Sequence, residues 1–439
     1  MAGALLDSLL ADGVANSATH PAWLGDARRL AAADLARDGL PGARSEAWKY
    51  TNLRALDQRR YVQGDAAAST RVVDAAVFAL PGIDGPCLVF VNGVYRADLS
   101  RSQPVDGLIL QPLSVALADD ADALRLFLAR HFDGAAQAFA RLNTALMLDG
   151  AVLRVAAGTH VAGLVHVVFV GAHAASDLAW QSRLLVELGE DASLKLVEHH
   201  VGEITEAHFG NVVSQIALGP RARLDLLQLQ SAPETATRIR RTDVVLEADA
   251  QLVVRSLEIG ALLSRHDLVV QLAGDRASLI SRGVFALRGR QHSDTRIDVR
   301  HVARDTTCDV VWRGVADQRS RGVFHGGITV EVGADGSDAS LSNKNLLLSA
   351  QAEIDTQPVL EIHADEVKAA HGATVGQLDP HAMFYLRSRG LSEPAARAML
   401  TLAFCRVAIE SITNIPLREH IDALLLARLP EASATGVSS

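Results

Sequence analysis

A turn followed by an Ala-x-Leu pair recurs through the middle of the chain, and this recurrence limits the possible folds more than any other feature. The motif reads GEDASL, GPRARL, EADAQL, GDRASL and GSDASL, with its alanine at Ala192, Ala222, Ala250, Ala277 and Ala339. The steps between these alanines are 30, 28, 27 and 62 residues, and the last equals two steps of 31. A period near 30 residues predicts a solenoid, in which each repeat stacks on the one before it.

The repeating units have the composition of strands and turns. From residue 151 onward, short Val, Leu and Ile runs are separated by Gly, Asp, Pro and Ser, with almost no helical periodicity. We therefore expect a mainly β protein with a β-helix core, in which the Ala and the Leu of each pair point inward. The skipped coil centres on Cys308, which we interpret as a core residue rather than a ligand, and one more step of 31 places Ala370 on the last coil.

The N-terminal flank is mostly helical in pattern. Leucines recur at helical spacing over residues 5–10, and residues 23–40 and 121–148 also predict helices, the first of these two ended by the Pro41-Gly42 pair. Residues 87–95 instead alternate like a strand around an Asn92-Gly93 turn, which predicts a hairpin.

The C-terminal flank returns to a helical pattern after residue 380. Ser392 is expected to start a helix, and a last helix is expected over residues 416–429 before a disordered tail. The first of these helices should carry an apolar stripe made of Leu400, Ala403, Phe404, Val407 and Ala408. We divide the chain into an N-terminal mainly helical region (1–150), the β-helix core (151–378) and the C-terminal helical region with its tail (379–439).

The composition disfavours several classes of partner. The chain has 42 Lys and Arg against 51 Asp and Glu, a formal net charge of −9, which disfavours nucleic acid or an anionic membrane. Aromatic residues make up only 4%, which disfavours a protein that stacks sugars or bases on exposed rings. The N-terminus lacks the basic residues of a secretory signal, and the apolar run at 161–172 is too short to span a bilayer. We therefore expect a cytoplasmic protein.

Cysteine usage limits the cofactors that this chain can hold alone. Cys87, Cys308 and Cys405 are far apart in sequence, so neither a disulfide framework nor a Cys-x-x-Cys metal site is expected. An iron-sulfur cluster usually needs about four thiolates, so no stably bound cluster is expected. The sequence also has no phosphate-binding loop and no flavin motif, so an ATP-driven step must come from a partner.

Four motifs resemble one family of proteins. The runs LSNKNLLLS, AEIDTQP and HGATVGQLD within residues 340–379, together with the N-terminal SEAWKYT, closely resemble the SufB/SufD scaffold proteins of the SUF iron-sulfur cluster assembly machinery. The local interpretation of SEAWKYT is a helix start, with Ser45 as N-cap and Trp48 and Leu53 buried.

The resemblance implies a fold, a function and a set of partners. It implies a right-handed parallel β-helix core flanked by N-terminal and C-terminal helical regions, and a non-enzymatic scaffold that builds and transfers nascent iron-sulfur clusters. SufB would pair through the last β-helix coils, and the SufC ATPase would bind the C-terminal helical region over residues 380–429. A homodimer through the surface offered to SufB is a further expectation for the isolated chain.

His371 is the strongest candidate for chemistry. It precedes Gly372, whose missing Cβ permits the close approach of another backbone, and it lies where the β-helix should end. An imidazole can ligate iron or shuttle a proton near neutral pH. Spacing alone favours a histidine that hydrogen-bonds a turn, whereas the resemblance implies a place at the SufB contact, as a transient ligand of iron or of the nascent cluster.

Missing cysteines distinguish between the branches of this family. Many relatives have a cysteine two positions before the histidine, where this chain has Ala369. Members of the SufB branch also carry a reactive cysteine upstream, whereas residues 340–370 contain none. The resemblance is therefore closer to the SufD branch.

Three other polar groups are weaker candidates. Glu198, His199, His200 and His208 could suggest a metal site, but adjacent histidines on a strand point to opposite faces, and a solvated β-helix face is the preferred interpretation. His292, Asp294 and Asp298 share one strand face, either a cation site or an exposed polar surface. Asn343, Lys344 and Asn345 predict a polar turn, with inward Asn stacking between coils as an alternative.

Two rival functions remain at this point. The first is a β-helix carbohydrate-active enzyme, which would need paired carboxylates or a metal, and aromatic rings to bind sugars. The second is a SufD-like interaction module without cluster chemistry, which would agree with Ala369 in place of the cysteine.

Overall fold

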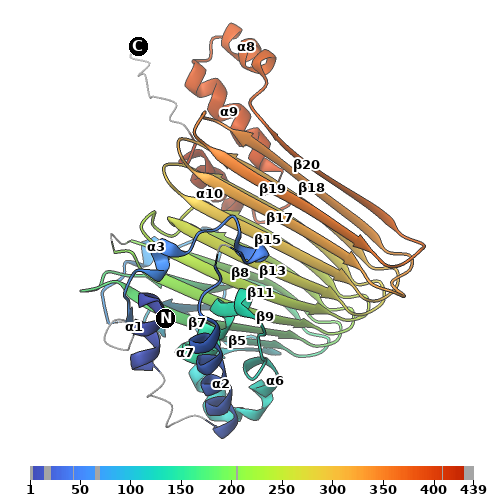
Figure 1. Cartoon of the computed structure of the whole chain (residues 1–439). Coiled ribbons are helices and arrows are strands. Elements are labelled where there is room, and N and C mark those ends of the chain that lie inside the picture. The colour runs from blue at the N-terminus through green and yellow to red at the C-terminus, as the bar shows by residue number, and fades with distance from the viewer. Residues whose placement is uncertain are drawn as a thin grey trace.

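The protein is a β-solenoid flanked by helices. The computed structural model describes residues 3–13, 21–42, 44–64, 70–203, 206–407 and 409–429. Each coil of the solenoid gives one strand to each of two long sheets, and successive coils pair in parallel (Figure 1). The expected mainly β fold with helical flanks is therefore confirmed.

The two sheets run the length of the molecule. The first sheet contains, from its C-terminal end, β19 (Glu353–Ile362), β17 (Arg321–Val330), β15 (His292–His301), β13 (Leu263–Leu272), β11 (Thr237–Leu246), β9 (Phe209–Leu218), β7 (Leu178–Leu188), β5 (Asp149–Val155) and β4 (Leu108–Pro112), with β1 (Val62–Gln63) beside β7. The second sheet contains β20 (Lys368–Gly376), β18 (Asp338–Leu347), β16 (Thr307–Ala316), β14 (Ser278–Leu287), β12 (Gln251–Glu258), β10 (Arg223–Gln230), β8 (Ser193–Gly202), β6 (His160–Gly171), β2 (Cys87–Val91) and β3 (Val94–Tyr95).

The core lies between the two sheets, and the Ala-x-Leu repeat forms the side of the core that belongs to the second sheet. Leu194, Leu224, Leu252 and Leu279 pair in register from coil to coil and are buried, as predicted. The predicted register is wrong at the end of the series, because Cys308 and Ala339 continue this leucine column rather than the alanine column. The next partner of Ala339 is Ala369, not Ala370. Coil lengths vary by a residue or two, so a fixed step of 31 missed the register of the last coils.

One turn of each coil carries a ladder of alternating charge. Asp191, Arg221, Asp249, Arg276 and Asp305 occupy equivalent turns, and all have left-handed backbone conformations with φ between 56° and 60°. Arg221 contacts Asp191 at 2.8 and 2.7 Å, and Arg276 contacts Asp249 at 2.7 Å through two bonds. Because these pairs are solvent-exposed, each contributes little to the stability of the fold.

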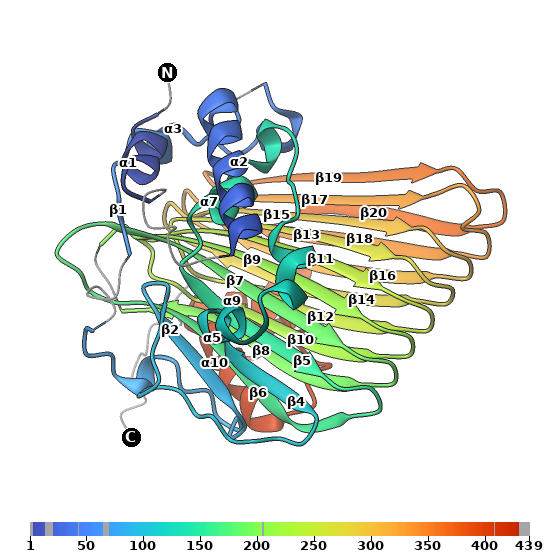
Figure 2. The ribbon, with the colours of Figure 1, turned by 90° about the horizontal axis from the view of Figure 1, so that it is seen from below.

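The N-terminal helices cover the outer face of the first sheet (Figure 2). They are α1 (Ala4–Gly13), α2 (Ala22–Asp38), α3 (Arg54–Asp57), α5 (Leu113–Asp120), α6 (Arg125–Leu128) and α7 (Ala138–Leu146), with short 3-10 turns at Glu46–Trp48, Ala75–Val77, Asp122–Leu124 and Ala135–Gln137. The first two helices and the β2–β3 hairpin at Asn92-Gly93 are confirmed. Gly39, with φ of 68°, ends α2 earlier than the predicted Pro41-Gly42 pair. The single helix predicted over residues 121–148 is broken into several pieces.

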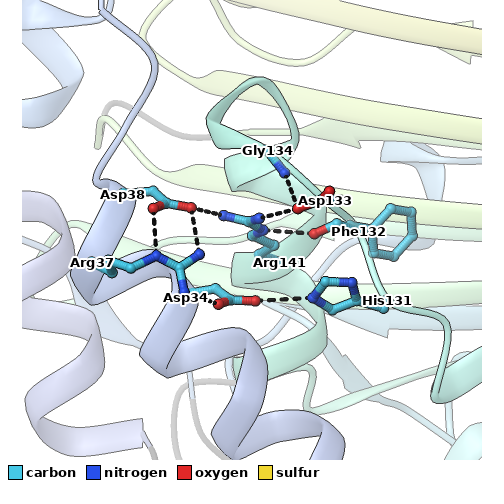
Figure 3. Close-up of polar contacts among 8 residues, drawn as sticks. All are labelled: Asp34, Arg37, Asp38, His131, Phe132, Asp133, Gly134 and Arg141. Carbon is cyan, nitrogen blue, oxygen red and sulfur yellow. Dashed lines mark hydrogen bonds and ion pairs between the residues drawn. The ribbon is translucent and has the colours of Figure 1, made fainter.

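A buried arginine ties α2 to α7. The guanidinium of Arg141 donates to the Asp38 carboxylate at 2.6 Å and to the Phe132 carbonyl at 2.6 Å (Figure 3). Asp34, one turn before Asp38, contacts the His131 ring at 3.0 Å. These contacts anchor the helical layer at a place where hydrophobic packing alone would not fix its orientation.

The SEAWKYT motif docks the chain onto β13 and β15. The Arg265 guanidinium lies 3.7 Å from the centre of the Trp48 ring and donates to the Ala47 carbonyl at 2.9 Å. The Thr51 hydroxyl donates to Asp294 at 2.6 Å. Trp48 is buried as predicted, but the segment is a 3-10 turn without a side-chain cap from Ser45, so the predicted helix start is wrong.

The C-terminal helices pack on the outer face of the second sheet. They are α8 (Pro380–Ser388), α9 (Glu393–Arg406) and α10 (Ile415–Leu426), and Ser392 caps α9 as predicted. The predicted apolar stripe is wrong, because Ala403 and Val407 are exposed, and the buried side is formed by Ala398, Thr401, Cys405, Ile409 and Ile412. The side chain of Ala408 and the tail after residue 429 lie outside the described residues. None of the helices in the described ranges is long and apolar enough to cross a membrane.

Candidate functional site: the open end of the solenoid

The last strand of the second sheet is an uncovered edge. Among the described residues, β20 pairs only with β18, and all nine of its residues are exposed or half-exposed. Its neighbour β19 ends the first sheet and is also largely uncovered. The backbone groups of such an edge can pair with a strand of another chain. The solenoid therefore ends in a surface that is ready for strand pairing (Figure 1).

His371 lies in the middle of this edge, within β20. It pairs with Leu341, which in turn pairs with Val310, and both of these partners are buried in the core. Because paired residues of a parallel ladder point to the same face, His371 continues an inward-facing column. It is exposed only because no further coil covers it. No hydrogen bond joins its side chain to another residue in the described ranges, so the alternative of a turn-bonding histidine receives no support.

Gly372 has open space around it. A Cβ added at Gly372 or at Gly376 would meet no heavy atom of the described residues beyond its own chain neighbours within 4 Å. Nothing in the described fold therefore requires a glycine at position 372. The close backbone approach expected there does not occur within the described part of the chain.

The thiol nearest to Ala369 in the same inward column is that of Cys308, two strands back. Its Sγ lies 3.2 Å from Nε2 of His301, and both residues are buried. Burial raises the pKa of the Cys308 thiol to about 12, so at neutral pH it is a neutral thiol rather than a reactive thiolate. The structure supports its interpretation as a core residue.

A cluster of amides lies just inside the open end. Asn343 and Asn345 face inward and are buried, so the predicted polar turn is wrong and the inward alternative is confirmed. Asn345 Nδ2 donates to the Asn343 side chain at 2.5 Å and to the Thr374 carbonyl of β20 at 3.1 Å, while the Thr356 hydroxyl of β19 donates to Asn343 at 2.8 Å. These contacts hold the last two strands on the coil before them.

The cluster of Glu198, His199, His200 and His208 is buried, so the predicted solvated face is wrong. His200 Nε2 contacts Glu198 at 2.7 Å inside the solenoid, whereas His199 stacks on His166 at 5.5 Å on the outer face of the sheet. Burial would raise the pKa of Glu198, but the hydrogen bond and charge of His200, together with Arg240 and Gln228, outweigh it and lower that pKa to about 2. Burial lowers the pKa of His200 to about 4. The adjacent histidines therefore point apart, as predicted, and do not share a site.

The proposed cation site on β15 is filled by an arginine. Asp294 accepts hydrogen bonds from Arg265 at 2.5 Å and from Thr51, and His292 lies 3.0 Å from the Thr51 hydroxyl. Asp298 is half-exposed, 3.4 Å from His325. Within the described ranges, no group of three His, Cys, Asp or Glu side chains is arranged to hold a metal ion. Asp294 and His292 thus anchor the SEAWKYT segment rather than a cation.

Comparison with known proteins places this architecture among β-solenoid proteins of iron-sulfur cluster assembly. Residues 169–404 match the family "SUF system FeS cluster assembly, SufBD core domain", and residues 14–167 match "SufBD protein N-terminal region". The chain belongs to the SufBD family of the SUF iron-sulfur cluster assembly system.

Its relatives include proteins of the SufD branch. It is 30% identical to the iron-sulfur cluster assembly protein SufD of Escherichia coli, over 90% of this chain and 91% of the relative. It is 25% identical to SufD of Bacillus subtilis, over 90% and 91%. It is 32% identical to an iron-sulfur cluster assembly SufBD family protein of Synechocystis sp., over 89% and 87%.

Proposed function

We propose that this chain is a scaffold subunit that builds and transfers nascent iron-sulfur clusters together with SufB and the SufC ATPase, without a catalytic turnover of its own. The observation that carries the proposal is the uncovered β20 edge with His371 at its centre. A solenoid strand left without a neighbour is suited to pairing with a second solenoid, and SufB is the partner that family membership favours.

His371 is the residue proposed to act on the cluster. Its ring is exposed at the end of an inward-facing column, so a partner strand laid along β20 would enclose it between two cores. In that position it would offer a transient ligand to iron, or a proton site, without a stably bound cofactor. No other His, Cys, Asp or Glu of this chain lies on β20 (Lys368–Gly376), so the partner must supply the remaining ligands.

The C-terminal helical region is proposed to bind SufC. Phe384 and Tyr385 on α8 are 74% and 57% exposed, and Ile415 at the start of α10 is 54% exposed. Large apolar side chains that project from an exposed helix, as Phe384 and Tyr385 do on α8, mark a protein interaction surface. Closure of the ATPase would then move this helical region and strain or open the scaffold interface. ATP hydrolysis would in this way change the surroundings of His371 by a movement of the subunits.

Co-purification tests the partners. Tagged chain expressed with untagged SufB and SufC in the cytoplasm is expected to elute as one complex, and deletion of residues 380–439 should release SufC but keep SufB. Val375→Lys, which places a charge on β20 at a position 42% exposed, should release SufB, while the matched Val245→Lys on β11, in the middle of the solenoid and 40% exposed, should not. Elution of the chain alone, or as a homodimer, with both partners present would refute the proposal.

Replacement of His371 separates the scaffold from its chemistry. His371→Ala is expected to keep the complex intact but to fail to restore cluster assembly in cells that lack the native subunit. Full restoration would leave the second candidate, an interaction module without cluster chemistry, which Ala369 in place of a cysteine also favours. The carbohydrate-active enzyme receives no support from the described residues. Buried carboxylates that could serve such an enzyme form ion pairs with arginines and stabilise the fold.

A further inference from the structure

Four arginines gather between the first sheet and the helices that cover it. They are Arg28 of α2, Arg130, Arg183 of β7 and Arg241 of β11, and we call them the arginine cluster. The guanidinium groups of Arg130, Arg183 and Arg241 surround the ring of Phe132, at 5.2, 5.8 and 5.5 Å from its centre. Phe132 therefore brings three cations to one place.

The cluster has too few carboxylates. Asp243 binds Arg241 through two hydrogen bonds of 2.8 and 2.7 Å and lies 3.4 Å from Arg130. No carboxylate of the described residues lies within ion-pair distance of Arg183 or Arg28. Among the described residues, the guanidinium of Arg183 donates hydrogen bonds only to the neutral side chains of Gln215, at 2.8 Å, and Thr144, at 2.7 Å. Buried charges in proteins are normally paired, so these two arginines need an explanation.

Both arginines keep a buried donor that has no partner. Arg183 is 0% exposed, and its Nε has no hydrogen-bond partner among the described residues. The Nε of Arg28 is also buried without a partner, although its Nη2 donates to the Met147 carbonyl at 2.9 Å. The pKa of Arg183 is lowered to about 9, chiefly by burial; attraction to Asp243 opposes the fall, and repulsion from Arg130, Arg28 and Arg241 adds to it. The guanidinium of Arg28 is thus close enough to Arg183 for their charges to interact.

Arg141 shows what a satisfied arginine looks like in this layer. It is as buried as Arg183, but it donates to the Asp38 carboxylate, lies 3.5 Å from Asp133 and also donates to a backbone carbonyl (Figure 3). The difference between these two arginines is that no carboxylate of the described residues contacts Arg183.

We propose that the arginine cluster binds a small inorganic anion, a halide or a phosphate-like oxyanion, held by Arg183 and Arg28 and reached from the side of Arg130. Charge-assisted bonds from two guanidinium groups are the usual way in which proteins hold such anions. Arg130 has a side chain 42% exposed and gives the site a route to solvent. The anion would join α2 to the solenoid. This inference does not depend on SufB, SufC or cluster assembly.

Thermal unfolding of the full chain at constant ionic strength tests the site. The reference buffer contains gluconate, an anion that is too bulky to reach buried donors. Phosphate, sulfate or chloride then replaces the gluconate. The wild-type melting temperature is expected to rise by roughly 2–4 °C at saturation, because an anion that binds only the folded state stabilises it by mass action. Arg183→Gln should lose at least about tenfold in anion affinity. The matched Arg141→Gln should melt lower at every concentration but keep the wild-type response.

The identity of the responding anion defines the site. A rise with phosphate and sulfate alone assigns an oxyanion, and a rise with chloride as well assigns a site of halide size. If Arg183→Gln does not fold, Arg28→Gln replaces it, and anomalous diffraction from crystals soaked in bromide should place an ion beside Arg183 Nε. Equal responses in wild type and Arg183→Gln, or no response and no ion at Arg183, would overturn the proposal.

Discussion

At its N-terminal end the solenoid core is covered by antiparallel strands, whereas at its C-terminal end the same core runs out into an uncovered strand. The β2–β3 hairpin and β4 close the first coils, with Tyr95, Leu108 and Leu110 packed over the core. At the other end, β20 carries only Ala, Gly, His, Thr and Val beyond its first residue, Lys368, and nothing in the described chain packs over it. Because each coil of a solenoid covers only its neighbours, an end needs a cap or a partner. This chain has a cap at one end only.

The largest expected contrast between the ends is their response to acid. Near the covered end, burial lowers the pKa of His166 to about 3, that of His199 well below its ordinary value and that of His200 to about 4. The unfolded chain binds protons at these histidines below about 6.5, but the folded chain does not. The free energy of unfolding should therefore fall as the pH drops from 6.5 toward 4, by up to about 1.4 kcal/mol per pH unit for each histidine. Urea denaturation at a series of pH values measures this slope.

One variant tests the contribution of the covered end to this slope. His166→Leu should flatten the slope, because one proton that only the unfolded chain binds is removed. Equal slopes for wild type and His166→Leu would show that His166 does not contribute. Loss of the carboxylate form of Glu198 adds to the fall below pH 4.5, because its folded pKa of about 2 lies below its ordinary value.

Truncation of one apolar side chain at each end gives the next largest difference. Phe90 is 0% exposed and stacks on Phe169 at 5.5 Å, so Phe90→Ala should destabilise the isolated chain by about 3–5 kcal/mol. Leu360 is only half-buried at the open end, so Leu360→Ala should lower the free energy of unfolding by about 1 kcal/mol or less. Denaturant midpoints compare the two. A large loss for Leu360→Ala in the isolated chain would mean that the open end is already covered, for instance by a second copy.

The sequence predicted the repeat but not the difference between the ends. Alternation and turn composition identify strands, and the Ala-x-Leu period identifies coils, because both depend on side chains that must face the core. The N-terminal cap is built from two segments. The hairpin of residues 87–95 was predicted, whereas the strand of residues 108–112 was not. The pairing of β2 with β6, and of β4 with β5, depends on contacts between segments that are distant in sequence. The local residue pattern does not encode such contacts.

The errors in the candidate sites have a common cause. Glu198 and His200 were predicted to face solvent because they are polar, yet both are buried and contact each other on β8. Asp294, for which a cation site or an exposed surface was predicted, is buried and accepts a hydrogen bond from Arg265 on the neighbouring strand. Buried polar groups are tolerated where they are hydrogen-bonded. A sequence pattern shows which face a residue takes, but not whether that face has a partner. His371 was placed on the last coil correctly because that prediction needed only the period of the repeat.

The amide cluster allows a finer test of the open end. Asn345→Ala removes the bond to the Thr374 carbonyl and leaves Asn343 with one partner fewer, so it should destabilise the chain by about 1–3 kcal/mol. Hydrogen exchange should become faster at β20 before it does at β2 or β6. The neighbouring Lys344→Ala, at an exposed position, serves as the control and should change neither quantity. Unchanged exchange at β20 in Asn345→Ala would show that these amides do not hold the strand.

The smallest expected effect on folding is at Gly372, and it is also the most informative about the partner. A Cβ there meets nothing within 4 Å, so Gly372→Ala should change the free energy of unfolding of the isolated chain by less than about 0.5 kcal/mol. A Cβ at Gly314, by contrast, would lie 2.2 Å from both Asn345 and Phe285, so Gly314→Ala should destabilise by about 1–3 kcal/mol. If a partner backbone lies against β20, Gly372→Ala should weaken its capture although the isolated chain is unaffected. If a normally folded Gly372→Ala chain captures its partner as well as the wild type does, the partner binds elsewhere. The open space at residue 372 would then serve neither folding nor assembly.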